Sequence, residues 1–393
     1  MNDKDKTGNQ TTDQPTEQSP DTAIEIEVES KPERKPSDQT TDQPTEPKPP
    51  MSKPLKITLI VIGILIGIVI IALIAVNVFV RSTYATFYDQ AEQEFSIPGI
   101  DSGFVPQDID YYDVGETWLF SGYMTDGSRS PVYKRYVNGD TFEVYINDTD
   151  GKPYSGHGSA ITSNDKFIYL TCENGYLVFN AEDFISLPGG ESITAVEKID
   201  LDFTPAFMNI ENNELYVGNF YHPQAYETPD EHHIATLDGQ EGAMNQAVMY
   251  VYGSNEWFQY GFSSTPVRAY SIPDRVQGVC ATADEKLIFS TSYGLASSHI
   301  LTYDTKGMEP DGYFSTSSCD VPLFILDART QVENLEAPPM TEGIETHEGR
   351  IFICDESATN KYIFGKLYGA GKVFSIPIPE DEISLMGKPV VQR

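Results

Sequence analysis

The sequence predicts an all-β fold: a β-propeller of five blades, or six if one degenerate copy escapes recognition, preceded by one transmembrane helix and a disordered N-terminal tail. Two observations predict it. An uncharged apolar run covers residues 57–80. After this run, short β-branched and aromatic stretches alternate with polar turns, one unit of this pattern recurs, and no segment has a sustained 3.6-residue apolar period.

Residues 1–56 are expected to be a Pro-, Thr- and Gln-rich cytoplasmic tail. They contain 12 acidic and 8 basic residues and almost no aromatic or large apolar ones. Such a segment cannot bury enough apolar surface to offset the entropy lost on ordering, so we expect disorder. The stretch TTDQPTE occurs twice, at 11–17 and at 40–46. A linear motif displayed twice and a local duplication both explain the repeat, and the composition favours the duplication.

The apolar run at 57–80 has 24 residues without a charge, more than the ~20 residues that cross a bilayer as a helix. It is too long, and too far from the N-terminus, for a cleaved signal peptide, so we expect a signal anchor. Lys48, Lys53 and Lys56 precede the run, and only Arg81 follows it closely. The positive-inside rule then predicts a single-pass protein of the cell membrane, with a cytoplasmic N-terminus and an extracellular propeller.

Residues 81–103 are expected to be a juxtamembrane linker and residues 104–393 the propeller domain. Gly63 and Gly67 have the small-xxx-small spacing of helix dimers, which leaves a helix-mediated homodimer open. Beyond the apolar run the chain holds 47 acidic and 18 basic residues, a net charge of −29. Such a surface repels phosphate backbones, so nucleic acid is excluded as a partner class. The four cysteines lie mostly in apolar runs, and we expect no disulfide framework.

The recurring unit is a small or rigid residue, a short alternating run, a polar turn and a second β-branched and aromatic run. Copies begin at Gly158, Pro205, Gly278 and Gly343, and a fainter copy covers 111–124. Each is a hairpin signal, and further strand-like runs follow each hairpin. About four strands per repeat is typical of a β-propeller, in which blades bury their faces against one another. Five copies therefore predict five blades.

The run from about 104 to 378 resembles a group of uncharacterised secreted or membrane-anchored β-propeller proteins of Gram-positive bacteria. The stretches that carry the resemblance include SGHGSAI, YSIPDRVQGV, STSYGLASSHI and CDESATNKY. The resemblance implies the fold and a location outside the cytoplasm. It implies no catalytic residues, because none is known for the group.

A polar residue stands beside each glycine that opens an expected inner strand: His157, Gln277 and Glu342. Inner strands converge on the propeller axis, so these side chains are expected near the mouth of the axial channel, with Tyr293 and Glu356 in equivalent loops. Polar groups that meet from distant blades can hold a ligand. The acidic surroundings favour a neutral polyol or a divalent cation over an anion. The alternative is a water-filled channel in which these residues are solvated.

We expect a binding module at the cell surface, with a glycan or a surface protein as its partner. The alternative is a hydrolase or lyase that acts on a carbohydrate or small ester at the channel mouth. Glu173 and Glu356 follow cysteines at matching places in two repeats and could form a carboxylate pair, although repeat equivalence alone explains the match. No nucleophile motif occurs, so binding is favoured over catalysis. No cofactor is expected beyond a possible divalent cation.

Overall fold

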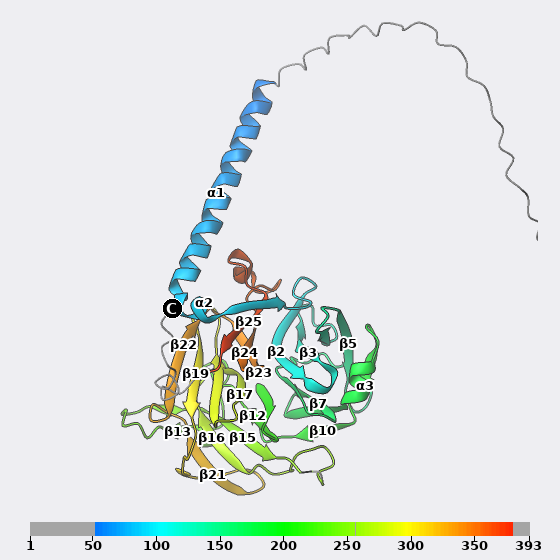
Figure 1. Ribbon diagram of the computed structural model, residues 1–393, viewed down its shortest axis with the longest axis vertical. Coiled ribbons are helices and arrows are strands. Elements are labelled where there is room, and N and C mark those ends of the chain that lie inside the picture. The colour runs from blue at the N-terminus through cyan, green and yellow to red at the C-terminus, as the bar shows by residue number, and fades with distance from the viewer. Residues whose placement is uncertain (1–51, 256, 380–393) are drawn as a thin grey trace, which may run out of the picture. The chain divides into compact units, whose positions relative to one another are not determined.

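The computed structural model describes residues 52–255 and 257–379, and within these ranges the strands after the first helix form five blades around one axis (Figure 1). The expected disorder of the N-terminal tail and the end of the expected propeller domain, 380–393, lie outside the described residues. The first helix is α1 (Lys53–Thr83), and its side chains are exposed along the apolar run. It is long and apolar enough to cross a membrane, the one such helix in the described ranges.

The first two blades are built from consecutive antiparallel strands. Blade 1 contains β2 (Phe104–Tyr112), β3 (Thr117–Met124), β4 (Pro131–Tyr136) and β5 (Thr141–Asn147), with β9 (Ser192–Thr194) added parallel to β5. Blade 2 contains β6 (Ile161–Ser163), β7 (Phe167–Cys172), β8 (Gly175–Asn180) and β10 (Glu197–Asp200). Short helices accompany them: η1 (Asp113–Gly115) joins β2 to β3, and α3 (Ala181–Ser186) follows β8.

Blade 3 is the largest. It contains β11 (Phe207–Glu211), β12 (Glu214–Gly218), β15 (Ala247–Gly253) and β16 (Arg268–Ile272), extended by β21 (Asp320–Ile325) and β20 (Gly312–Ser315). The connection between β12 and β15 is the long insertion that the sequence predicts on a blade face. It holds η2 (Asp230–His232) and a small hairpin of β13 (Ile234–Ala235) and β14 (Met244–Asn245).

Blade 4 contains β17 (Val276–Ala281), β18 (Lys286–Thr291), β19 (Ser298–Asp304) and β22 (Gln331–Ala337). Blade 5 contains β23 (Thr341–His347), β24 (Arg350–Asp355) and β25 (Lys372–Pro377), with β1 (Glu92–Ser96) as its outermost strand. The helix η3 (Ile363–Leu367) lies in the connection between β24 and β25. The helix α2 (Ala85–Gln90) lies between α1 and β1.

The five predicted hairpins fall on five different blades, which confirms the expected repeat. The inner strands β2, β6, β11, β17 and β23 each contact the next, and β23 contacts β2. This ring defines the axis. The predicted turn chemistry is also present, because Asn212 and Asn213 have positive φ angles of 52° and 60°. At the turn into β7, Asn164 Oδ1 accepts from the backbone N–H of Phe167 at 2.9 Å.

The segment expected to be a linker, 81–103, supplies the outermost strand of blade 5. In β1, Glu92 pairs with Ser375 of β25 and Ser96 pairs with Lys372. The strand reads EQEFS and is largely exposed. Its pairing depends on backbone hydrogen bonds rather than on an apolar face, so no alternating apolar pattern marks it. The first strand of the described chain thus joins the last one in blade 5.

The core is divided among the blade interfaces. In the part of the chain that the structure describes, five apolar clusters each lie between one blade and the next. Trp118 of blade 1 packs on Phe352 of blade 5 with ring centroids 4.5 Å apart. Phe207 of blade 3 meets Phe289 of blade 4 edge to face at 6.4 Å. A single blade cannot bury both of its faces, so the blades stabilise one another.

Candidate ligand pocket

Three inner strands are irregular at the same end of the propeller. The pairing register shifts between Pro106 and Asp108 in β2 and between Val276 and Gly278 in β17. It also shifts between Thr341 and Ile344 in β23. A β-bulge leaves its extra residue outside the ladder and redirects that side chain. The residues freed in this way are Gln107, Gln277 and Glu342, and all three line one cavity.

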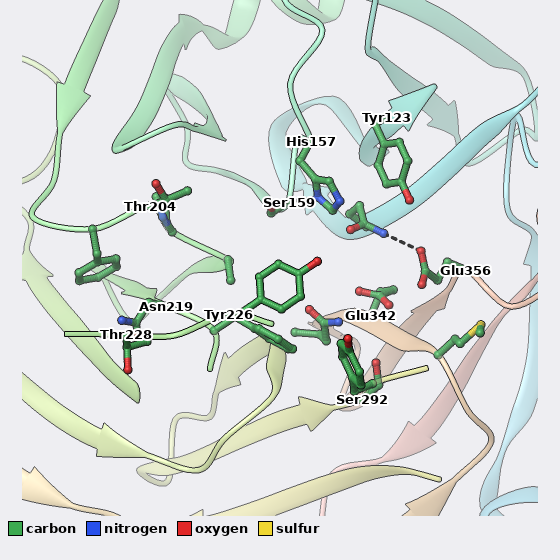
Figure 2. A pocket seen from close by; sticks show the side chains of 18 of the residues that line it. Tyr123, His157, Ser159, Thr204, Asn219, Tyr226, Thr228, Ser292, Glu342 and Glu356 are labelled. Atoms are coloured by element: carbon green, nitrogen blue, oxygen red, sulfur yellow. Dashed lines mark hydrogen bonds between the residues drawn. The ribbon is translucent and has the colours of Figure 1, made fainter. Parts of the chain in front are cut away.

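This cavity has a volume of about 780 Å³, within the range of small-molecule sites (Figure 2). It brings together the five residues that the sequence singles out: His157, Gln277, Tyr293, Glu342 and Glu356. They come from blades 2, 4 and 5. Convergence of the predicted residues on one small volume is therefore a property of the structure, whereas their role in binding stays a prediction.

Glu342, Glu356 and Gln107 form a hydrogen-bonded group at one end of the cavity. Gln107 Nε2 donates to Glu356 Oε2 at 3.0 Å, the dashed contact in Figure 2. The carboxyl groups of Glu342 and Glu356 are hydrogen-bonded to each other. Burial, and then the charge of Glu356, hold the pKa of Glu342 well above its usual range. Glu342 therefore keeps its proton and donates a hydrogen bond to the Glu356 carboxylate.

The pKa of Glu356 is also raised, to about 7, because burial outweighs the opposing charge of Lys361. The two carboxyl groups thus carry at most one negative charge between them near neutral pH. Lys361 also lines the cavity and carries a positive charge that offsets it. Asp202 and Glu227 add carboxylates elsewhere in the lining, and they accept hydrogen bonds from Ser317 and Gln224.

Aromatic rings form two stacked pairs in or beside the cavity. The His157 ring stacks on Tyr123 with centroids 4.5 Å apart, and the Tyr123 hydroxyl accepts from Lys361 Nζ at 2.6 Å. On the opposite side Tyr293 stacks on His222 at 3.6 Å. Flat apolar faces beside polar groups are typical of sites that bind small organic molecules.

His157 is not a sensor of neutral pH. Water reaches its imidazole from the cavity, but the surrounding walls and then the charge of Lys361 lower its pKa to about 4. The ring is therefore neutral at pH 7. Its Nδ1 lies 3.2 Å from the Ser159 hydroxyl. The Glu356 carboxyl, which the sequence already singles out, does titrate near neutrality, because burial raises its pKa to about 7.

The insertion between β12 and β15 forms part of the cavity wall, as the prediction of a blade-face insertion implies. Its residues 226–229 line the cavity, and Figure 2 shows the Tyr226 side chain among those that line it. The Tyr226 ring is 57 % exposed. An exposed aromatic side chain on a loop beside a cavity can contact a bound molecule without first breaking a packed core.

Two buried carboxyl groups of β2 join blade 1 to blade 2. Asp108 Oδ2 accepts from the backbone N–H of Ile161 at 2.8 Å, and Asp110 accepts from the Ser163 hydroxyl at 2.6 Å. Both bonds join the inner strand of blade 1 to that of blade 2. Burial raises the pKa of both carboxyl groups. Inner-strand polar residues are thus of two kinds, those that join strands and those that face the cavity.

The sequence also misplaces or misses several residues. Glu173, considered as a partner of Glu356, is exposed and does not line the cavity. Gln107 was missed because Asp108 follows it, whereas glycine follows Gln277 and Glu342. The matching position in the repeat was the available signal.

In residues 52–255 and 257–379, no group of three or more His, Cys, Asp or Glu side chains is placed so that it could hold a metal ion. The four cysteines at 172, 280, 319 and 354 are free thiols, and those at 280 and 354 are buried.

No protein-family model matches the chain, and no curated protein matches it. Among solved structures, the PQQ-bound aldose sugar dehydrogenase of Streptomyces coelicolor is 10 % identical, with a TM-score of 0.40 over 73 % of this chain and 97 % of that one. A gluconolactonase of Xanthomonas campestris is 9 % identical, with a TM-score of 0.35 over 74 % and 95 %. A nidogen/laminin complex is 9 % identical, with a TM-score of 0.34 over 64 % and 73 %. Similarities this low carry no argument about chemistry.

Proposed function

We propose that this chain is a membrane-anchored, extracytoplasmic β-propeller that binds a neutral, polyhydroxylated small molecule, such as a sugar or the end of a glycan, in the cavity at one end of its axis. The observation that carries the proposal is the meeting of Gln107, Gln277 and Glu342, each placed by a bulge or register shift in its inner strand, with Glu356 in one cavity.

The chemistry of the lining favours a neutral ligand. Amide groups donate and accept hydrogen bonds, and the protonated Glu342 and its partner Glu356 add one donor and several acceptors. The single charge of this pair is offset by Lys361, and further carboxylates in the lining disfavour an anion. The stacked rings of His157 on Tyr123 and of Tyr293 on His222 offer flat faces for the apolar side of a sugar ring.

The test is a thermal-shift screen of the full-length chain in detergent micelles. The probes are neutral mono- and oligosaccharides, a uronic acid, an amino sugar and CaCl2. A ligand that binds only the folded state stabilises it by RT ln(1 + [L]/Kd), so the midpoint rises with the logarithm of the ligand concentration. We expect a neutral sugar to give the largest shift. A response to Ca²⁺ or to the uronic acid alone contradicts the proposal.

Variants locate the response. Gln277→Ala and Glu342→Gln should each abolish the sugar-dependent shift while leaving the unliganded midpoint close to that of the parent. Glu173→Ala is the matched control, because Glu173 is an exposed carboxylate outside the cavity. If both cavity variants respond to the sugar as the parent does, the binding site lies elsewhere.

A hydrolase is the second candidate, favoured by the direct hydrogen bond between Glu342 and Glu356. Two carboxyl groups that share a proton can activate water, as in aspartic proteases. The test is product release from chromogenic small esters. Turnover by the parent that Glu356→Gln abolishes would support the hydrolase, and no turnover would reject it.

A further inference from the structure

Two loops beside the cavity contact the end of the membrane-spanning helix. Asn77 lies in the apolar run of α1, and its Nδ2 donates to the backbone carbonyl of Leu367 in η3 at 2.7 Å. Tyr84, just after α1, has its hydroxyl 3.1 Å from that of Ser297. Ser297 belongs to the loop between β18 and β19, which also carries Tyr293 of the cavity lining.

Both loops also carry exposed apolar side chains. In η3, Ile363 is 58 %, Phe364 52 % and Leu367 36 % exposed, and in the other loop Leu295 is 58 % exposed. Exposing several large apolar side chains to water is costly, and such a group on a loop marks a contact surface. Lys366 of η3 is paired with Asp101 at 3.0 Å, so the polar residue of this helix already has a partner in the propeller.

The position of Asn77 along α1 indicates what covers this surface. Asn77 precedes Arg81 by four residues, and the apolar run ends between them, after Val80. At a rise of 1.5 Å per residue, the contact with η3 lies about 6 Å inside the level of Arg81. Interfacial elements bury their apolar side chains about 5–10 Å into the boundary between headgroups and acyl chains. The exposed side chains of η3 therefore lie at the depth of that boundary.

We propose that η3 and Leu295 form a membrane-contact surface that inserts into the lipid leaflet beside α1. The surface is continuous with the lipid-facing side of the helix through Asn77 and Leu367. The chain beyond α1 is strongly acidic, so the lipid that it contacts is zwitterionic rather than anionic. Tyr362 and Tyr293 of the cavity lining adjoin this surface in the chain, and the contact holds the cavity mouth close to the membrane.

The test uses the full-length chain in phosphatidylcholine vesicles with or without brominated acyl chains, which quench tryptophan at membrane depth. Trp257→Phe provides the background, because Trp257 is 82 % exposed and the other tryptophan, Trp118, is only 4 % exposed. Into this background we place Phe364→Trp, or Tyr313→Trp as the control. Tyr313 is 77 % exposed on β20 of blade 3.

We expect the tryptophan fluorescence added by Phe364→Trp to have an emission maximum at shorter wavelength than that added by Tyr313→Trp. The fluorescence of Phe364→Trp should also lose intensity in brominated vesicles, whereas that of the control should not. Ile363→Trp is a second probe should the first variant unfold, which near-ultraviolet circular dichroism reports. If neither η3 variant is quenched, or if the control is quenched equally, the surface does not insert into lipid and the proposal is wrong.

Discussion

The carboxylate of Asp108 occupies the place where a side chain of Gly343 would stand. A Cβ added to Gly343 would collide with Asp108 Oδ1 and with the Asp108 backbone. The other carboxylate oxygen, Oδ2, accepts from the backbone N–H of Ile161. Gly343 is in β23, Asp108 in β2 and Ile161 next to it in β6. One glycine thus allows three inner strands from three blades to approach and bond beside the cavity.

Gly343→Ala should lower the free energy of unfolding by about 1–3 kcal/mol, because the methyl group forces β2 and β23 apart in a packed interior. Urea unfolding followed by circular dichroism measures the change. Gly312→Ala is the control, since a Cβ there meets nothing within 4 Å and Gly312 does not have a positive φ. Equal stability of the Gly343 and Gly312 variants would refute the packing argument.

The close approach of the inner strands was predictable from sequence. Gly278 and Gly343 stand at matching places in two repeats, and the structure brings them into contact: a Cβ on Gly278 would lie 2.8 Å from the Gly343 Cα. The polar residues before them, Gln277 and Glu342, were singled out for the same reason and do line the cavity. A repeat aligned on its glycines therefore locates both the tight packing and the residues beside it.

Gln107, the strand β1 and the contact of Lys361 with Tyr123 could not be predicted from sequence, because neither apolar periodicity nor a glycine marks them. Gln107 holds the bulged position in β2, but the residue after it is aspartate, so an alignment on glycine passes over it. The strand β1 pairs through its backbone and reads as a polar linker. Lys361 reaches Tyr123 from a different blade. Such a contact depends on tertiary geometry, which no local pattern encodes.

Glu356→Gln should make the stability of the folded chain less sensitive to pH between about 5 and 8. The pKa of Glu356 is raised from 4.5 to about 7, chiefly by burial. The folded state then binds the proton more tightly than the unfolded state does. The contribution of this proton binding to the free energy of unfolding is fully present below pH 4.5 and is lost as the pH rises through 7. Midpoints of thermal unfolding across this range measure the effect.

Glu173→Gln is the control for this titration, because Glu173 is exposed on blade 2. The parent and the control should lose stability equally as the pH rises, and Glu356→Gln should lose less. Other buried carboxyl groups with raised pKa values, such as Asp110, contribute in the same direction, so some decline remains. A steeper decline in Glu356→Gln than in the parent would contradict the assignment.

The orientation of the chain in the membrane follows from Lys48, Lys53 and Lys56 before the apolar run and Arg81 after it. We expect protease added to intact cells to remove an epitope tag placed after residue 393 and to spare one placed before residue 1. Permeabilised cells, in which both tags should be lost, are the control. Loss of only the N-terminal tag from intact cells would reverse the orientation.

Lys361→Met should raise the pKa of His157. Burial is the larger cause of the lowered value, about 4, and the charge of Lys361 is the second. Removing that charge removes only the second cause, so the pKa should move upward but stay below 6.5. The variant also loses the bond from Lys361 to the Tyr123 hydroxyl. A looser stack of Tyr123 on His157 would admit more water and move the pKa in the same direction.

The measurement is an NMR titration of the imidazole signals of the six histidines, with the His157 signal assigned by its loss in His157→Asn. Lys152→Met is the control, because Lys152 is an exposed lysine paired with Asp150 in another part of the chain. It should leave the His157 signal unchanged. An ordinary His157 pKa near 6.5 in the parent would show that the cavity walls do not desolvate the ring. A downward shift in Lys361→Met would show that Lys361 does not act on it through its charge.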